Sequence, residues 1–556
     1  MFGLVYAIIF TFGIFFQWSL WFMMGFTIAI VLLQYLLGPY IIRWVYAIEW
    51  IPYETFSIQY PHLVDIINKV VDSRGIKTPR IGIINDLNPN AFTFGHTKNN
   101  ARIVITRGIL HYLDEKEQQA VVAHELGHVI HSDFILMTIV FAIPLLLLTI
   151  VRWCYYSSRG FFRSQDEKGV GVAIGAALIA IAVLSYVAYF ISYLVSLVIS
   201  RIREYYADEH AGELIENPNY LSSALVKIAY GLIMEREVED RRSSRTRALK
   251  GLGIFDPNIA AAFAVASTGA YGKLSKEAIQ AAAAWDLFNP WAKYYQMFST
   301  HPLPAKRIMR LNNQCEIYGI KPEIDFTYAR KLKEEQAGKS MFPEFMTDLT
   351  IKFLPIIILI ALIALTAVFI FGIETSLTNI YSNLLLFWAF GFFLIGFGVL
   401  IRIGFKYKSG FEPKTVLDLV TYIKASPIRT IPAILEGRIV GRGAPGYYFG
   451  EDMILQDNTG LIYLDYESLI PLFGNIIFAM RTIKKYIGQQ VRVIGWYRRG
   501  PGPYIEIKSI ESANGQRNKN YRKQVSYFWA IVAFIIGLFL FYYWYIASPN
   551  GFFGIF

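Results

Sequence analysis

The sequence His124-Glu125-Leu126-Gly127-His128 places two histidines and a glutamate at a spacing that could bind and use a metal ion. On a helix, residues four positions apart project from one face, so both imidazoles can reach one Zn²⁺. The adjacent Glu125 then points at the remaining coordination position, where it can act as a general base. The pattern indicates zinc-assisted hydrolysis, in which a water molecule is the nucleophile.

A third metal ligand is available in the sequence Arg203-Glu204-Tyr205-Tyr206-Ala207-Asp208. Catalytic zinc sites use three protein ligands and keep a fourth position open. If Glu204 binds the metal, Asp208 lies on the same helix face and can orient a ligating imidazole. Taken alone, Glu204 is more typical of a solvated helix carboxylate. Its combination with the two histidines favours a role for Glu204 as a metal ligand.

Two other interpretations of the histidine motif are possible. His124 and His128 could be helix-face residues beside a membrane, or ligands of a closed structural site. A structural zinc site fills four positions and often uses cysteine, whereas Cys154 and Cys315 are the only cysteines and neither has a suitable spacing. Two such separated cysteines also cannot build a disulfide framework, which agrees with a reducing cytoplasm.

The sequence around the motif predicts the helix that it requires. Asp114 precedes Glu117 in an arrangement that can cap a helix, and apolar spacing continues through the motif toward a long hydrophobic run. Upstream, residues 61–73 have helical spacing, and residues 80–106 are typical of short β-strands separated by turns. We therefore expect a small α+β unit in front of the motif helix.

Uncharged runs long enough to cross a membrane account for the hydrophobic content of 54%. Residues 1–42 carry no charge and fit two spans that turn near Gln17-Trp18-Ser19. A secretory signal peptide is the alternative, but residues 1–10 offer no Lys or Arg for its basic region. Five further runs follow, at residues 134–151, 170–200, 353–373, 384–401 and 525–546. The sequence thus predicts seven spans.

The distribution of the basic residues predicts the orientation. The net charge is +11, and the segments 43–133, 201–352 and 402–524, which share one side, hold nearly all Lys and Arg. By the positive-inside rule, these large segments are expected in the cytoplasm. The basic loop 152–169, which lies on the opposite side of the membrane, argues against this orientation.

Residues 412–513 change in character to β-like runs, with a helical stretch at residues 468–486 between the third and the fourth run. Three strands, a helix and two strands is the order of an OB-like barrel. A nucleic-acid-binding barrel is an alternative, because basic and aromatic residues accompany each other there. These are Arg438, Arg442, Tyr447, Tyr448, Trp496, Tyr497, Arg498 and Arg499. A solvated barrel face is the more usual outcome, so nucleic acid is not an expected partner.

Three blocks together resemble the HtpX and CAAX prenyl protease family of membrane gluzincins. They are the histidine motif, the block around Glu204, and Ser299-Thr300-His301-Pro302 followed by Arg307-Ile308, and they occur in the family's order. The resemblance covers roughly residues 1–340. The arrangement of two spans before the motif and two flanking Glu204 resembles HtpX, whereas CAAX prenyl proteases place more spans before the motif. The later spans and the barrel-like domain have no counterpart in a minimal HtpX.

The resemblance implies a role for each matching residue. His124, His128 and Glu204 would bind one Zn²⁺ per chain, Glu125 would be the general base and proton shuttle, and Asp208 would support a ligand. His301 would stabilise the oxyanion, with Arg307 as its partner, although a lone His-Pro is usually only a turn. The family's edge strand, to which a peptide adds, corresponds to Asn90, Ala91, Phe92, Thr93, Phe94 and Gly95. An ordinary hairpin strand is the alternative there. His96, His131 and His210 are expected to be surface or packing residues.

The expected fold is a multi-span α-helical membrane protein with a mainly α (α+β) zincin-type catalytic domain and a C-terminal all-β OB-like domain. The expected parts are a transmembrane hairpin (1–43), catalytic segments (44–133 and 201–350), span pairs (134–200 and 351–403), the β domain (410–515) and a last span (525–546). The resemblance implies a zinc endopeptidase of the cell membrane that cleaves membrane or misfolded proteins at the cytoplasmic surface. A membrane scaffold or receptor with a vestigial zinc site is the rival function.

Overall fold

The computed structural model describes residues 10–163, 170–238, 263–372, 377–442 and 451–547, without residues 12, 14, 264, 269–273 and 339. The chain forms two compact units. Unit 1 comprises residues 1–261 and 294–325, and unit 2 comprises residues 262–293 and 326–556. The segment 201–350, which was expected to form one part, is therefore divided between the two units.

Unit 1 contains a four-stranded sheet in the order β1-β2-β4-β3. The strands are β1 (Ile48–Ile51), β2 (Arg80–Ile84), β3 (Ala91–Gly95) and β4 (Ala101–Thr106). Strands β2 and β4 are parallel, and the other two pairs are antiparallel. Strand β3 lies at one edge of this sheet, as the family resemblance implied, so one side of its backbone pairs with no other described strand.

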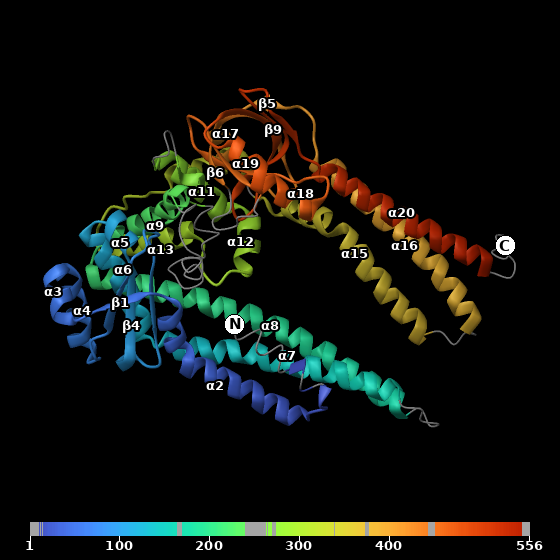
Figure 1. The fold of residues 1–556 in the computed structure, drawn as a ribbon, viewed down its shortest axis with the longest axis horizontal. Coiled ribbons are helices and arrows are strands. Elements are labelled where there is room, and N and C mark those ends of the chain that lie inside the picture. Colours follow the sequence, from blue (N-terminus) through green and yellow to red (C-terminus); the bar gives the residue numbers. More distant parts are fainter. Residues whose placement is uncertain are drawn as a thin grey trace. The chain divides into compact units, whose positions relative to one another are not determined.

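The helices of unit 1 surround this sheet and extend away from it (Figure 1). They are α2 (Leu20–Val45), α3 (Tyr53–Gln59), α4 (Pro61–Arg74), α5 (Arg107–Tyr112), α6 (Glu115–Ile130), α7 (Asp133–Arg163), α8 (Val170–Ile215), α9 (Asn219–Val238) and α13 (Pro304–Ile317). Helix α12 (Pro290–Met297) crosses the boundary between the units. Helix α6 carries the histidine motif and begins with the predicted capping box, in which Asp114 and Glu117 each accept a backbone N–H of the other.

A close approach of α6 and α8 brings the two metal-binding blocks together. A Cβ atom at Gly127 would lie 3.0 Å from the Cα of Ala207, closer than side chains normally pack. Glycine at this position therefore allows the backbones to approach until side chains from both helices can reach one point. The glycine inside the histidine motif thus contributes to the site, although it has no side chain.

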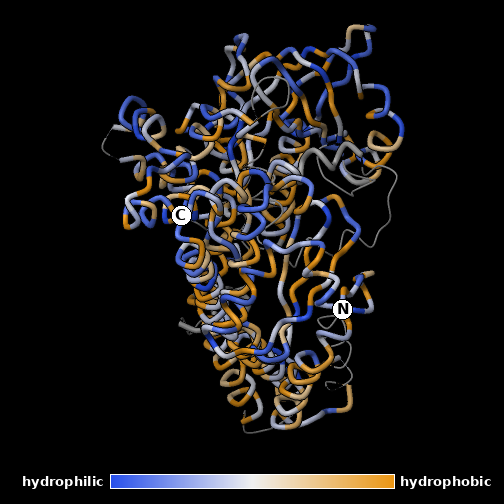
Figure 2. The backbone as a smooth tube through the Cα atoms, turned by 90° about the vertical axis from the view of Figure 1, so that its left-hand side faces the viewer, coloured by the Kyte–Doolittle hydropathy of each residue, from blue (hydrophilic) through white to orange (hydrophobic). Residues whose placement is uncertain are grey.

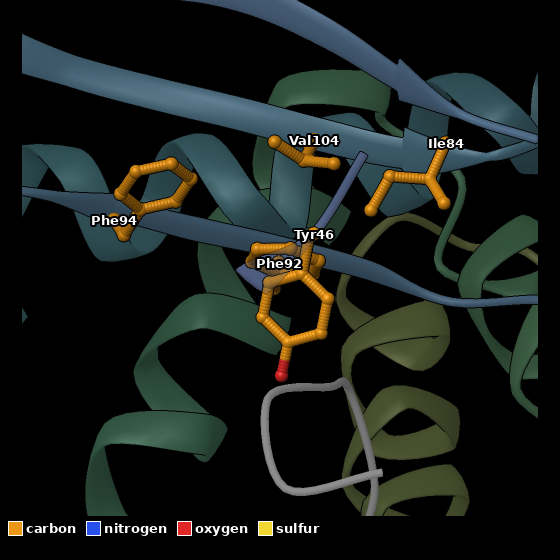
Figure 3. Packing of buried hydrophobic residues seen from close by; sticks show 5 residues of the cluster. All are labelled: Tyr46, Ile84, Phe92, Phe94 and Val104. Atoms are coloured by element: carbon orange, nitrogen blue, oxygen red, sulfur yellow. The ribbon is translucent and has the colours of Figure 1, made fainter. Parts of the chain in front are cut away.

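Apolar packing fixes the end of α2 against the sheet. Tyr46, just beyond α2, is buried with Ile84, Phe92, Phe94 and Val104 from the three strands β2, β3 and β4 (Figure 3). The hydroxyl of Tyr35 and the backbone of α2 also hydrogen-bond to His96, which follows β3. The end of β3 is thereby fixed to a membrane helix.

Six described helices are long and apolar enough to cross a membrane: α2, α7 and α8 in unit 1, and three in unit 2. Apolar residues follow these long helices in Figure 2. Within unit 1, α2 joins α7 through a buried 3.0 Å hydrogen bond between the hydroxyls of Thr27 and Thr149. All six match predicted spans. The seventh, before the predicted turn, lies mostly outside the described residues; Ser19 caps the start of α2 after that turn.

Unit 2 combines three membrane helices, α15 (Phe342–Gly372), α16 (Leu377–Lys406) and α20 (Arg522–Ala547), with helices and a barrel. Its other helices are α11 (Lys276–Phe288), α14 (Thr327–Ala337), α17 (Val416–Val420), α18 (Pro471–Ile477) and α19 (Ile483–Tyr486). Its strands are β5 (Glu412–Pro413), β6 (Ile431–Arg442), β7 (Met453–Gln456), β8 (Leu461–Asp465), β9 (Gln490–Arg499), β10 (Pro503–Ser512) and β11 (Arg517–Lys519).

Five of these strands close a barrel. Strand β6 pairs with β7, β7 with β8, β8 with β10, β10 with β9, and β9 returns to β6. Only the pair of β8 and β10 is parallel among these five. The helical segment predicted between the third and the fourth strand is present as α18 and α19.

Two arginines proposed for nucleic-acid binding lie inside unit 2. Arg498 is buried with Glu506, at 2.7 Å, and Arg499 is buried beside Asp286 of α11. Trp496 and Tyr497 are buried as well. Tyr447 and Tyr448 lie outside the described residues. Trp496, Tyr497, Arg498 and Arg499 therefore do not contribute to an accessible face, whereas Arg438 is exposed.

Candidate metal centre and active site

Three ligand-type side chains converge where α6 and α8 meet. One nitrogen of His124, one nitrogen of His128 and one carboxylate oxygen of Glu204 lie within 4.8 Å of one another. The Nε2 atom of His124 is 3.8 Å from Oε2 of Glu204, and Nε2 of His128 is 3.9 Å from Oε1 of the same carboxylate. Ligands of a tetrahedral zinc with bonds of about 2.1 Å would be about 3.4 Å apart, so the three atoms would approach one another by up to about 1.4 Å on binding.

The chemistry of these atoms fits a metal ion. Nε2 of His124 and Oε2 of Glu204 are buried and have no hydrogen-bond partner among the described residues. Buried polar atoms are normally satisfied, so such a pair indicates a missing partner. Two imidazoles, one carboxylate and an open fourth position form a donor set that catalytic zinc uses.

A carboxylate holds the second nitrogen of each histidine. Nδ1 of His124 is 3.0 Å from Oδ1 of Asp208, and Nδ1 of His128 is 2.7 Å from Oδ2 of Asp133. In a metal-bound site, each carboxylate would favour the tautomer in which Nε2 carries the free lone pair and faces Glu204. The sequence predicted Asp208 in this role but not Asp133, which also pairs with Arg203.

Arg307 links the two carboxylates of α8 from helix α13. Its side chain is fully buried, and it donates two hydrogen bonds to Asp208, with lengths of 2.8 and 2.6 Å. Its Nη1 atom is 3.6 Å from Oε2 of Glu204. A two-pronged arginine–carboxylate contact is rigid, so Arg307 fixes Asp208, which in turn orients His124.

Glu125, the expected general base, is buried next to the edge strand. The hydroxyl of Thr93 on β3 donates a 2.7 Å hydrogen bond to Oε2 of Glu125. Thr93 was predicted to lie on the substrate-binding strand, but its contact with the glutamate was not predicted. The edge strand and the histidine helix are thus joined at the group that would carry the proton.

His301 reaches the same carboxylate from the segment before α13. Its Nδ1 atom lies 3.3 Å from Oε1 of Glu204, and its side chain is partly exposed. The hydroxyl of Ser299 shapes this segment, since it accepts the N–H of His301 and donates to the carbonyl oxygen of His301. His301 is therefore held beside the three ligand atoms with one face toward the cleft.

The local electrostatics favour a charged His128 when no metal is bound. Burial lowers the pKa of this imidazole, but the hydrogen bond to Asp133 and the charges of Glu204 and Glu125 outweigh it and raise the pKa to about 9. A metal ion at this point must therefore displace a proton from His128.

A cleft of about 660 Å³ opens from the site. Its lining includes Glu125, His128, Glu204 and His301, together with residues 91–95 of β3. It continues along apolar side chains of the membrane helices α2 and α7, such as Val31, Met137 and Phe141. The cleft therefore connects the ligand atoms to the surface of two helices that can cross a membrane.

The remaining predicted residues do not line the cleft. Asn90 is not among the residues that line the cleft; its backbone N–H is bound by the hydroxyl of Thr106. The ring centroids of His131 and His210 lie 6.3 Å apart in an edge-to-face arrangement, and His96 contacts α2, in agreement with surface or packing roles.

Asp133 and Thr93 are the orienting residues that the sequence did not reveal. Asp133 follows the turn at Ser132, whose φ of 57° redirects the chain so that the carboxylate folds back on His128. The only available signal was an acidic residue at the start of a membrane helix, which is costly in an apolar run unless it is paired. No feature of the sequence indicated that Thr93 contacts Glu125.

Comparison with known proteins agrees with this geometry. The model of peptidase family M48 matches residues 57–314, which include all three ligand-type residues. A protein named protease HtpX homolog, from Methanothermobacter thermautotrophicus, is 36% identical over 257 residues, covering 45% of this chain and 89% of the relative. The protein of the same name from Methanocaldococcus jannaschii is 29% identical, covering 47% of this chain and 78% of the relative.

A solved structure, Ste24p of S. mikatae, is 17% identical with a TM-score of 0.33, covering 56% of this chain and 63% of that chain. The sequence matches show the family, because the chain covers 89% of the first relative at 36% identity. The chain therefore belongs to peptidase family M48, and it is a multi-pass membrane metalloprotease related to the HtpX proteases.

Proposed function

We propose that the protein is a zinc endopeptidase in which His124, His128 and Glu204 hold one Zn²⁺ per chain. The observation that carries this proposal is the convergence of these three ligand atoms within 4.8 Å, from two helices, beside a buried glutamate. Two orienting carboxylates and unsatisfied buried ligand atoms support it. The donor set is the one that peptidases with a two-histidine, one-glutamate site use.

When bound, zinc supplies Lewis acidity that acidifies a water molecule and polarises a peptide carbonyl. Glu125 accepts the proton of that water and later delivers it to the leaving amine. Thr93 holds the glutamate by a 2.7 Å hydrogen bond, so one carboxylate oxygen stays free for the proton. His301 donates a hydrogen bond to the developing oxyanion, and Arg307 keeps the polar groups behind Glu204 fixed.

The edge strand β3 is the proposed substrate-binding element. An extended peptide would pair with the free side of residues 91–95 through main-chain hydrogen bonds, with its backbone passing Glu125. Asn90, at the start of the strand, would bind a substrate carbonyl. The pairing recognises backbone rather than side chains, so it suits a protease with many substrates.

The proposed substrates are membrane proteins and misfolded proteins. The cleft beside β3 continues along apolar residues of α2 and α7, so an apolar segment could enter from the bilayer. The distribution of basic residues supports a cell-membrane protein with both soluble parts in the cytoplasm. The closed five-stranded barrel, with a helix after its third strand, supports an OB-like domain.

A substitution of Glu125 tests the proposed chemistry. We expect purified Glu125→Gln protein to bind zinc like the wild type but to lose casein cleavage and self-cleavage by at least about a thousandfold, since the general base is removed. Glu115→Gln, an exposed glutamate on the same helix, is the matched control and should keep full activity. Wild-type activity of Glu125→Gln at stoichiometric zinc would reject Glu125 as the base and favour a scaffold with a vestigial site.

A further inference from the structure

Unit 1 has a second pocket, of about 570 Å³, where the end of α2 meets the sheet. Three arginines line it: Arg43 from the last turn of α2, Arg80 from β2 and Arg102 from β4. Tyr40, Trp50 and Tyr53 are the aromatic residues of its lining, which contains no carboxylate. The pocket is therefore basic with aromatic walls.

The arginines of this pocket lack a counter-charge within the described parts of the chain. Arg80 and Arg102 are partners in register on the parallel strands β2 and β4, so two like charges stand side by side. Nη1 of Arg102 is buried without a hydrogen-bond partner, and its guanidinium lies over the ring of Phe94. Burial and the neighbouring Arg80 lower the pKa of Arg102. An anion in the pocket would offset the repulsion between Arg80 and Arg102, and it would accept a hydrogen bond from the buried Nη1 of Arg102.

The length and composition of α2 indicate that the pocket would lie at the level of the membrane headgroups. The uncharged part of α2, residues 20–38, is about 28 Å long at 1.5 Å per residue, which matches a hydrocarbon core of about 30 Å. Tyr40 and Trp44 follow it and are 61% and 84% exposed, as interfacial aromatic residues are. With α2 across the membrane, Arg43 in the same turn would lie at the phosphate layer on the side that carries the soluble part of unit 1.

We propose that this pocket binds the headgroup of an anionic phospholipid, with the guanidinium groups of Arg43, Arg80 and Arg102 on its phosphate. A zwitterionic phospholipid also has a phosphate, but its ammonium group would meet three arginines and no carboxylate. The aromatic rim can contact the glycerol and the first methylenes of the acyl chains. A free phosphate would gain only the polar part of these contacts, so the lipid is the favoured occupant.

The test uses the full chain, purified in a neutral detergent, and measures its Tm against dioctanoyl phosphatidylglycerol, dioctanoyl phosphatidylcholine and inorganic phosphate. We expect phosphatidylglycerol alone to raise the Tm of the wild type in a saturable way. The variant R80Q/R102Q should bind it about a hundredfold more weakly, because each charge-assisted contact accounts for about tenfold. Arg107→Gln, an exposed arginine just beyond β4, is the control and should bind like the wild type.

Equal responses to the two lipids, or an unchanged affinity in R80Q/R102Q, would overturn the proposal. An equal response to inorganic phosphate that the double variant loses would assign the pocket to a free anion and overturn the lipid assignment. If the double variant does not fold, Arg43→Gln at the exposed helix end serves instead. It should weaken binding about tenfold, and an unchanged affinity would again overturn the proposal.

Discussion

The contact between Thr93 and Glu125 gives the edge strand a direct influence on the proposed base. Replacing Thr93 by Val keeps the shape of the side chain but removes the hydroxyl that binds Oε2 of Glu125. We expect kcat to fall about tenfold, since a hydrogen bond to a charged group is worth about 1.5 kcal/mol or more. Thr93→Ser, which keeps the hydroxyl, should restore most of the rate.

Zinc content separates this effect from damage to the metal site. Both Thr93 variants should retain the wild-type zinc content, because neither touches a ligand. A valine variant with wild-type kcat, or a serine variant as impaired as the valine variant, would show that the hydroxyl does not position Glu125.

The raised pKa of His128 predicts how metal binding depends on pH. Without metal, His128 is protonated below a pKa of about 9, and zinc needs the neutral imidazole. The affinity should therefore rise about tenfold per pH unit from pH 6 to pH 8 and level off above pH 9. Competition with a coloured chelator measures this slope. An affinity that is flat between pH 7 and pH 8 would contradict the prediction.

Asp133 is expected to support zinc through His128. Asp133→Asn leaves the shape of the residue but removes the charge 2.7 Å from Nδ1. Loss of such an orienting partner typically costs about 10–100-fold in metal affinity. The same chelator competition checks this above pH 9, where His128 is neutral in both proteins. Affinity equal to the wild type would show that Asp133 only pairs with Arg203.

At the scale of elements, the crossing of α6 and α8 decides whether the ligands meet. Gly127→Val would force the backbones apart at Ala207, at a cost of about 1–3 kcal/mol. We expect reduced zinc content and activity, measured by elemental analysis and casein cleavage. Gly25→Val, in α2 where a Cβ meets no atom within 4 Å, is the matched control. Full zinc content in Gly127→Val would mean that the crossing tolerates a larger separation.

The elements that the sequence predicted well are those with strong local signals. The capping box of Asp114 and Glu117, the apolar runs of the spans and the alternation of the barrel strands all act within a few residues. The contacts that it missed are tertiary. Thr93 and Glu125 are 32 positions apart, and Asp133 reaches His128 only because the chain turns at Ser132.

Buried charge explains the other departure from the sequence-based expectation. Two neighbouring arginines such as Arg498 and Arg499 are typical of a solvated or nucleic-acid-binding face. In the structure they are instead buried in unit 2, where Arg498 pairs with Glu506 and Arg499 with Asp286. Strand alternation cannot distinguish an outward arginine from an inward one whose partner is on another element. The association of α11 with the barrel unit is also a tertiary contact, which no local pattern in the sequence indicates.

At the scale of the molecule, the proposed orientation places the exposed residues Lys77 and Lys519 in the cytoplasm. Cys154 and Cys315 are buried, so a single introduced cysteine can be read against a low background. We expect Lys77→Cys and Lys519→Cys to react with an impermeant maleimide only after the cells are lysed. Labelling of either variant in intact cells would contradict the cytoplasmic assignment of that part.

The central claim is that His124, His128 and Glu204 together hold one zinc ion. Its most direct test is the zinc content per chain of purified wild type, Glu204→Ala and the matched control Glu209→Ala, an exposed glutamate on the same helix. We expect close to one zinc in the wild type and the control, and less than about a tenth in Glu204→Ala, together with loss of cleavage. One tightly bound zinc and full activity in Glu204→Ala would contradict the claim.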